Sequence, residues 1–359
     1  MGWPNPLRNF APILPFPFKE PAVELLNISN RKLEKICRKS LRAYHAPSKA
    51  DELRTTTFLR IFLDYLPDDG RRVLSTDIIG TDGDDVALRC LAQYLRDAIL
   101  KPANGKPLGA VKIASGTQPD MLPTYALDAK HHLLRDPGPL LRDLCLRRDG
   151  FQCAYRNLLD KHTAECKLGC APGVKLSHTM CALILPFALG NNVGYMESEV
   201  TKHNKVAIWT ALQRYFPSLV KNPTKAMESI YTVANALTLD CNLRSKFEGF
   251  RLAFLPRSSY AEFDICWLSD PPKDQHISRA RNERHTFMRL KFHATNLPNP
   301  SREFLEIHYR IACILLYSNI GAAIEHELAR NAMLHPRTIQ SDGSTDLGNI
   351  VQEKLLTHI

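Results

Sequence analysis

The spacing of apolar residues in the first hundred positions predicts helices. Six apolar residues fall on neighbouring positions of one helix face before Pro67: Phe58, Leu59, Phe62, Leu63, Tyr65 and Leu66. Intervals of three and four residues are typical of an amphipathic helix, and the proline ends it. A second helix is predicted after Asp82, with an inward face of five residues: Val86, Cys90, Leu91, Tyr94 and Leu95.

Beyond residue 100 the pattern changes. The stretch 101–139 is rich in Pro, Gly and Lys and has no sustained period, which predicts a long surface connection. A short basic helix is then predicted at 140–148, followed by the start of a strand or hairpin at 150–159. An irregular segment, 161–175, separates these from a buried, strand-like run at 181–189.

The remaining apolar pattern predicts helices around two strands. Helical periodicity returns at 206–216 and 225–236, and strands are predicted at 250–254 and 263–268 with a turn at 256–259. Asn299 and Pro300 are typical of a helix cap and first turn, and they predict the start of a further helix. The apolar face of this helix is predicted to hold Phe304, Ile307, Ile311, Ile314 and Leu315. Residues 341–347 predict a turn before a final short helix.

Composition and charge leave several classes of partner open. The 359-residue chain has a formal net charge of +10, which suits a polyanion partner without requiring one. The start lacks a secretory pattern, and the longest apolar run contains Pro186 and is too short to span a bilayer. We therefore expect a cytoplasmic or nuclear protein with no membrane partner.

The ten cysteines show no paired spacing that defines a metal site. Cys166 and Cys170 form one C-x3-C pair near Cys153 and His162, but no second pair completes a zinc set. Cysteines of a core or a loop are the favoured interpretation, and we expect neither a metal nor a cofactor.

Four segments carry a resemblance to a known family. The run 141–153, a basic helix leading to Cys153, resembles the entry to fungal HNH domains. The run 179–187 resembles the Cys-Ala-His-Ile-Leu-Pro signature, 234–239 the asparagine element, and 242–247 the Leu-His-x-x-Phe element. At these four places the order, spacing and flanks resemble those of the fungal HNH-nuclease-like proteins, and the resemblance extends over nearly the whole chain.

The resemblance implies a fold and a damaged active site. It implies an α+β fold with a degenerate ββα-metal (HNH-like) core at 140–295 between helical regions at 1–139 and 296–359. In that family the first histidine activates water, the asparagine orients it, and a later histidine holds a divalent cation. Leu183 and Arg244 stand at the two histidine positions. Leucine accepts no proton and a fixed guanidinium repels a cation, so we expect no metal-dependent cleavage.

The direction of these replacements favours a metal-free small-molecule enzyme of fungal natural-product biosynthesis. We expect Arg244 to anchor or polarise a carboxylate or carbonyl, with Asn235 beside it, in a cyclisation, cycloaddition or isomerisation. The apolar substrate would contact four residues: Leu183, Cys181, Phe187 and Phe247.

Three alternatives remain open at this point. The first is a pseudonuclease that binds nucleic acid through basic clusters at 31–42 and 279–291. The second is rescue of the nuclease by His162, His178 or His203, although their spacing favours structural or surface roles. The third is a chain that has lost all activity and serves as a structural or regulatory partner.

Overall fold

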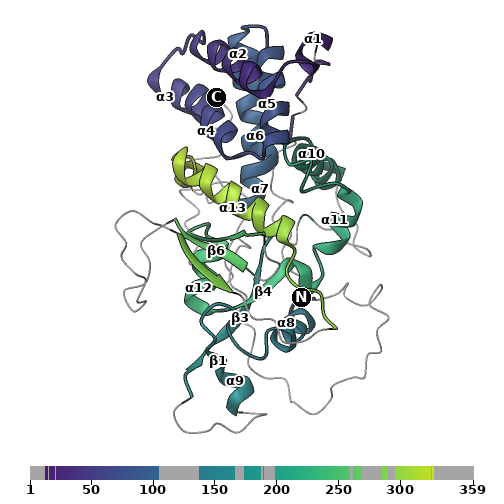
Figure 1. Cartoon of the computed structure of the whole chain (residues 1–359), viewed down its shortest axis with the longest axis vertical. Coiled ribbons are helices and arrows are strands. Elements are labelled where there is room, and N and C mark those ends of the chain that lie inside the picture. Colours follow the sequence, from purple (N-terminus) through teal and green to yellow (C-terminus); the bar gives the residue numbers. More distant parts are fainter. Residues whose placement is uncertain are drawn as a thin grey trace, which may run out of the picture. The chain divides into compact units, whose positions relative to one another are not determined.

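The computed structural model confirms a mixed helix and sheet fold of the α+β class (Figure 1). It describes residues 13–14, 16–20, 22–104, 137–165, 174–186, 189, 199–258, 262–268, 285–289, 296–324 and 326. The chain forms two compact units, each built from separate stretches. Unit 1 comprises 1–6, 106–197 and 219–312, and unit 2 comprises 7–105, 198–218 and 313–359.

All the described regular elements of unit 2 are helical. Its main elements are α1 (Val23–Leu26), α2 (Asn30–Arg42), α3 (Lys49–Glu52), α4 (Phe58–Tyr65), α5 (Asp68–Gly80), α6 (Asp85–Leu95), α7 (Lys101–Asn104) and α10 (Glu199–Tyr215), with π-helical turns η2 (Leu53–Thr57) and η3 (Arg96–Leu100). The amphipathic helix predicted before Pro67 is confirmed, because α4 buries Phe58, Leu59, Phe62 and Leu63.

The inward face predicted for α6 is wrong at two positions. Val86 is 58% exposed and Cys90 is exposed, whereas the buried stripe also includes Leu88 and Ala92. The helix begins after Asp84, whose carboxylate accepts the backbone N–H groups of residues 86 and 87. At 100° per residue, positions 86 and 90 fall opposite the stripe formed by residues 88, 91, 92 and 95.

Helix α10 lies in unit 2, although the sequence resemblance placed its residues within the central region 140–295. Asp77 of α5 is buried and accepts hydrogen bonds from Arg214 Nε at 3.0 Å and from the Tyr215 hydroxyl at 2.8 Å. A Cβ atom at Gly70 would collide with the Tyr215 carbonyl, so glycine permits the close approach of α5 and α10. A buried carboxylate paired in this way couples the two helices.

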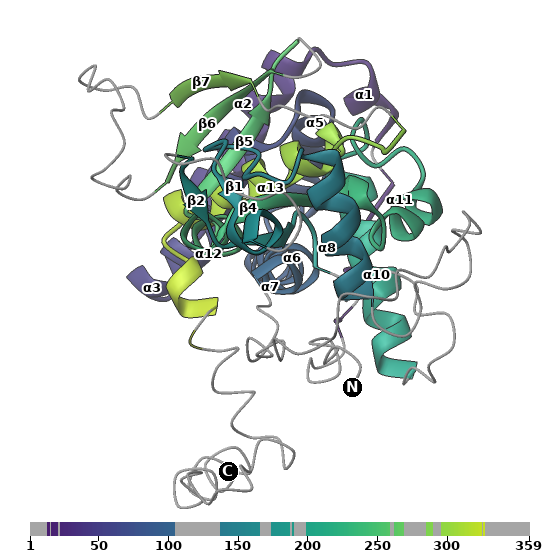
Figure 2. The same cartoon turned by 90° about the horizontal axis from the view of Figure 1, so that it is seen from below.

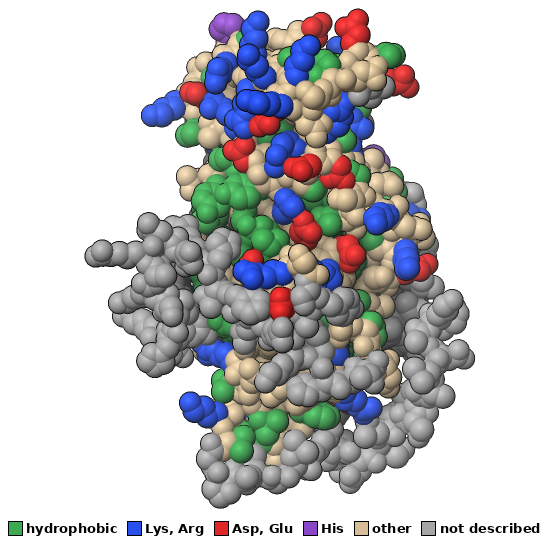
Figure 3. Space-filling model, in the orientation of Figure 1, with side chains coloured by type: hydrophobic (Ala, Val, Ile, Leu, Met, Phe, Trp, Pro, Cys, Tyr) green, Lys and Arg blue, Asp and Glu red, His purple; other side chains and the backbone are tan. Residues whose placement is uncertain are grey.

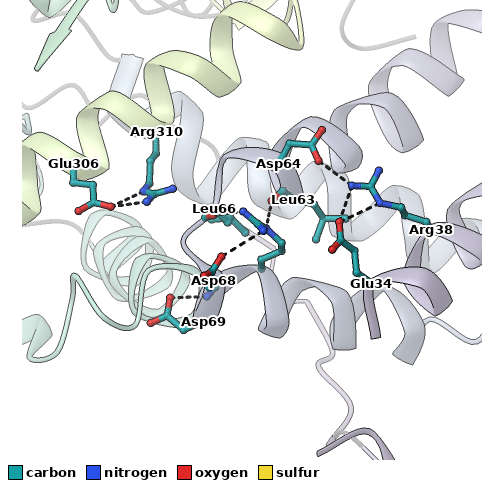
Figure 4. A network of polar contacts seen from close by, with 11 residues as sticks. Glu34, Arg38, Leu63, Asp64, Leu66, Asp68, Asp69, Glu306 and Arg310 are labelled. Atoms are coloured by element: carbon teal, nitrogen blue, oxygen red, sulfur yellow. Dashed lines mark hydrogen bonds and ion pairs between the residues drawn. The ribbon is translucent and has the colours of Figure 1, made fainter. Parts of the chain in front are cut away.

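Another contact in unit 2 fixes α2 against α4. Arg38 donates to Glu34 on its own helix at 2.7 Å and to Asp64 at the end of α4 at 3.1 Å (Figure 4). The inner face of α2 buries Leu33, Cys37 and Leu41. Its outer face is therefore the part of the helix that meets solvent.

The described residues of unit 1 form three small sheets. β1 (Leu159–Asp160) pairs in parallel with β2 (Leu176–Ser177), and β3 (Thr179–Leu183) pairs antiparallel with β4 (Ala236–Asp240). The third sheet has the antiparallel order β5 (Leu252–Pro256), β6 (Glu262–Trp267) and β7 (His285–Arg289) (Figure 2). Its helical elements are α8 (Pro137–Arg148), α9 (Lys161–Thr163), α11 (Pro223–Ser229), the 3-10 turn η6 (Val233–Asn235), α12 (Cys241–Glu248) and the first part of α13 (Arg302–Tyr317). The residues of α13 beyond Ala312 belong to unit 2.

Two predicted helix ends in this part of the chain are wrong. The helix predicted at 225–236 stops at Ser229, and Ala236 already begins β4. The last helix is capped by Ser301, whose hydroxyl accepts the Phe304 N–H at 3.1 Å, rather than by Asn299. Its five predicted apolar residues are all buried, so that face is confirmed. The turn predicted at 341–347 lies outside the described residues.

None of the helices in the described ranges is long and apolar enough to cross a membrane.

Candidate functional site

The segments compared with the nuclease motifs form two paired strands followed by a helix. β3 pairs with β4 over its whole length, from Thr179 opposite Asp240 to Leu183 opposite Ala236. α12 follows β4 directly. Its N-cap is Asp240, whose Oδ1 accepts the N–H groups of residues 242 and 243, both at 3.1 Å. This cap fixes the direction in which α12 leaves the strand.

A fully buried ion pair holds α8 against β4. Arg148 and Asp149 have no exposed side-chain surface, and Nε and Nη2 of the guanidinium bind the two carboxylate oxygens at 2.6 and 3.0 Å. Arg148 also donates to the carbonyls of Val233 and Ala236, and Asp149 accepts the Thr238 N–H. The end of the basic helix is thus part of the scaffold, because its last arginine donates hydrogen bonds to backbone carbonyls inside unit 1.

Arg244 lies on α12 beside β3. Its Nε donates to Glu248 Oε1 at 2.8 Å, and its Nη1 lies 3.2 Å from the Met180 sulfur. The side chains of Arg244 and Glu248 are 19% and 27% exposed, so both are half-buried but open to solvent on one side. The backbone N–H of Leu183 acts on the Glu248 carboxyl group as well, since it lowers the pKa of that group. The carboxylate of Glu248 is therefore influenced by the residues at both expected histidine positions.

The partly buried position of Glu248 raises the proton affinity of its carboxylate. Burial raises the pKa of its carboxyl group above the usual value, and the opposing effects of Arg244 and the Leu183 N–H only partly offset it. The pair also opposes the helix dipole, since the cation lies in the first half of α12 and the anion at its last residue. Helix stability alone does not account for this order of charges.

Leu183 and Cys181 face α8 rather than an open, solvent-filled site. Both are partly buried and pack against a cluster of Leu141, Cys145, Val233 and Ala236. The Cys181 thiol lies 4.0 Å from the Cys145 sulfur. These two predicted substrate contacts therefore line an apolar layer between β3 and α8.

Asn235 is a positioning residue in this structure. It is fully buried, and its amide nitrogen donates to the carbonyls of Leu185 and Ile230 at 2.8 and 3.0 Å. Its amide oxygen accepts the Leu185 N–H at 2.9 Å. These bonds fasten the chain after β3 to the turn before β4. An amide occupied in this way is not available to touch a substrate.

Phe247, predicted as a substrate contact, is part of the core. It has no exposed surface, and its ring stacks on His308 with centroids 4.1 Å apart. It also contacts Phe254 at 5.5 Å between ring centroids. The remaining predicted contact, Phe187, lies outside the described residues.

The three histidines considered as substitutes do not assemble a metal site. His178 is exposed and precedes β3 at the end opposite Leu183, and His203 binds the Ile13 carbonyl within unit 2. His162 is exposed on α9. Among the residues with described positions, no group of three or more His, Cys, Asp or Glu side chains could hold a metal ion. Cys166 and Cys170 lie outside those residues.

Sequence reasoning missed Glu248, Cys145 and the Arg148–Asp149 pair. Glu248 could have been found from its i,i+4 spacing to Arg244, whereas the partners of the other residues come from distant segments. In the comparisons with known proteins, no family model, curated protein or solved structure matches this chain. The site must therefore be interpreted from its own geometry.

Proposed function

We propose that the chain is an HNH-like protein without nuclease activity, whose ββα unit binds an apolar small molecule and rearranges it without a metal. The substrate carries a carboxylate or carbonyl, and the reaction is an isomerisation or cyclisation of the kind used in fungal natural-product biosynthesis. The observation that carries the proposal is the half-buried pair Arg244–Glu248 beside β3, with its raised carboxyl pKa.

The two side chains support different roles. Arg244 offers fixed N–H donors, so it anchors an anionic or carbonyl oxygen of the substrate. Glu248 exchanges a proton more readily near neutral pH than an exposed carboxyl, which suits a general acid or base. Met180 provides the adjoining non-polar surface.

Thermal-shift screening with apolar carboxylic acids and ketones tests this function. A ligand at a hundred times its dissociation constant stabilises the native state by about 2.7 kcal/mol, which raises the melting temperature by about 5–10 °C. Arg244→Ala should weaken binding by about 10- to 100-fold, the range for hydrogen bonds to a charged group. Glu248→Gln should retain binding but lose turnover of any ligand that is converted.

The chain offers a matched control for this screen. Arg310 on α13 forms an i,i+4 pair with Glu306 at 2.6 Å, with side-chain exposures of 22% and 25% (Figure 4). Arg310→Ala therefore removes a comparable cation from another helix of unit 1. If Arg244→Ala and Arg310→Ala bind every hit equally well, Arg244 is not the anchor and the proposal fails.

A second candidate function, binding of nucleic acid, is favoured by the outer face of α2. Five exposed cations of this helix form no ion pair with any residue in the described ranges: Arg31, Lys32, Lys35, Lys39 and Arg42. Figure 3 shows Lys and Arg side chains gathered over this part of unit 2. Neighbouring cations four residues apart lie about 6 Å apart along the helix axis. The second proposed basic cluster, 279–291, has no described side chains.

Salt dependence separates the second function from the first. If all five cations neutralise phosphates, affinity for duplex DNA falls by about 500-fold between 50 and 200 mM salt. Lys35→Glu/Lys39→Glu should abolish most of this dependence, whereas Arg244→Ala should leave it unchanged. Absence of binding at 50 mM salt excludes this function.

A further inference from the structure

Two cysteines from distant segments meet at the apolar layer of unit 1. The thiol of Cys181, on β3, donates to the sulfur of Cys145, on α8, and the two sulfurs are 4.0 Å apart. The positions are 36 residues apart in the sequence, so the fold and not local chain geometry brings them together. Cys145 is fully buried, whereas Cys181 keeps part of its surface.

We propose that Cys145 and Cys181 are a site of oxidative modification. A peroxide oxidises the two thiols, and an intramolecular disulfide forms between them. A disulfide bond is about 2.05 Å long, so each sulfur must move by about 1 Å. This displacement is within reach of small side-chain rotations in a layer made of leucine, valine and alanine side chains. The modification is independent of the function proposed above.

The chemistry assigns different roles to the two thiols. The more exposed Cys181 attacks hydrogen peroxide as the thiolate, breaks the O–O bond and becomes a sulfenic acid with release of water. The Cys145 thiol then attacks the sulfenic sulfur, and the second water leaves. In total, two thiols and one peroxide give one disulfide and two water molecules.

The surroundings of Cys181 set the rate of this reaction. The hydrogen bond to Cys145 and burial raise the pKa of the Cys181 thiol well above its usual value, while Arg148 and Arg244 oppose the shift. Only the thiolate is the nucleophile, so little of it is present at neutral pH. The site should therefore oxidise slowly at pH 7 and faster as the pH rises.

Trypsin separates the relevant cysteines cleanly. Cleavage after Lys and Arg places Cys145 in peptide 143–147 and Cys181 in peptide 176–202. Peptide 149–156 carries Cys153 and peptide 226–244 carries Cys241. Cys153 is a matched control, because it is fully buried in the same unit and lies beside Asp240 rather than beside another thiol.

The test treats the reduced full-length chain with hydrogen peroxide at pH 7 and pH 9, alkylates the remaining thiols after unfolding, and maps the peptides by mass spectrometry. We expect a cross-linked 143–147/176–202 species that forms at least several times faster at pH 9, disappears with dithiothreitol, and leaves peptide 149–156 alkylated. Cys145→Ala should divert Cys181 to sulfinic or sulfonic acid. If Cys145 stays alkylatable in the unaltered chain while Cys181 oxidises alone or pairs with Cys241, the proposal is overturned, whether or not the variant folds.

Discussion

Acidification should destabilise unit 1 through one buried histidine. His308 is 1% exposed and lies between the rings of Phe247 and Phe250, at centroid distances of 4.1 and 4.6 Å. Its Nε2 donates to the Phe247 carbonyl at 3.1 Å, and its buried Nδ1 finds no hydrogen-bond partner in the described part of the chain. Protonation would place a charge and an unpaired donor in this apolar sandwich.

The size of the effect follows from the shift in pKa. Burial lowers the pKa of His308 from 6.5 to about 3, against a smaller opposing effect of the Phe247 carbonyl. Between these values the unfolded chain binds more protons than the native one, so stability is present above pH 6.5 and is lost as the pH falls. The loss amounts to about 2 kcal/mol between pH 7 and pH 5 and reaches about 4 kcal/mol by pH 3.

Urea unfolding at several pH values measures this contribution. Trp267 lies in unit 1, so a Trp3→Phe/Trp209→Phe background makes its fluorescence a reporter of that unit. From pH 7 to pH 5, the free energy of unfolding of this background protein should fall by about 2 kcal/mol more than that of its His308→Phe variant. His178→Gln, at an exposed position, is the control. Parallel stability curves for the parent and His308→Phe would refute the reasoning.

Three further substitutions test the scaffold around the site. Arg148→Met should destabilise unit 1 by about 3–5 kcal/mol in urea unfolding, because Asp149 keeps a buried charge without its partner, and a cost below about 1 kcal/mol would contradict that reasoning. Asn235→Ala should lower the free energy of unfolding by about 2–4 kcal/mol, because it leaves three backbone groups unpaired. The folded variant should still bind ligand with unchanged affinity. A selective loss of binding would indicate that Asn235 contacts the substrate. Phe247→Ala should cost about 3–5 kcal/mol in the same assay, as for a core aromatic residue, and a near-neutral result would contradict its assignment to the core.

Local periodicity predicted the elements that bury a regular apolar face. The helix at 58–65, the hairpin strands after Arg251 and the face of the last helix all follow this rule. Periodicity gives no information about partners, so the fully buried Arg148 resembles an ordinary basic residue at a helix end. The helix predicted at 225–236 extends wrongly through a 3-10 turn to Ala236, the first residue of β4, because the pairing of β4 with β3 is a non-local contact.

The candidate site was only partly predictable for the same reason. Arg244 could be singled out by its position in a motif, but its carboxylate partner and the Leu183 N–H meet only after α12 packs on β3. Asn235 and Phe247 illustrate the opposite case. A polar amide and an aromatic ring near a motif suggest chemistry, whereas here backbone hydrogen bonds and ring stacking occupy them.

Plasmid nicking tests most directly the central proposal, that the ββα unit no longer cleaves nucleic acid with a metal. The purified chain should leave supercoiled DNA intact with Mg²⁺, Mn²⁺, Ni²⁺ or Zn²⁺, because Leu183 accepts no proton and Arg244 binds no cation. A Leu183→His/Arg244→His variant should gain metal-dependent nicking if the scaffold still supports the old geometry. Metal-dependent nicking by the unaltered chain, retained after Arg244→Ala and lost with chelator, would contradict the proposal.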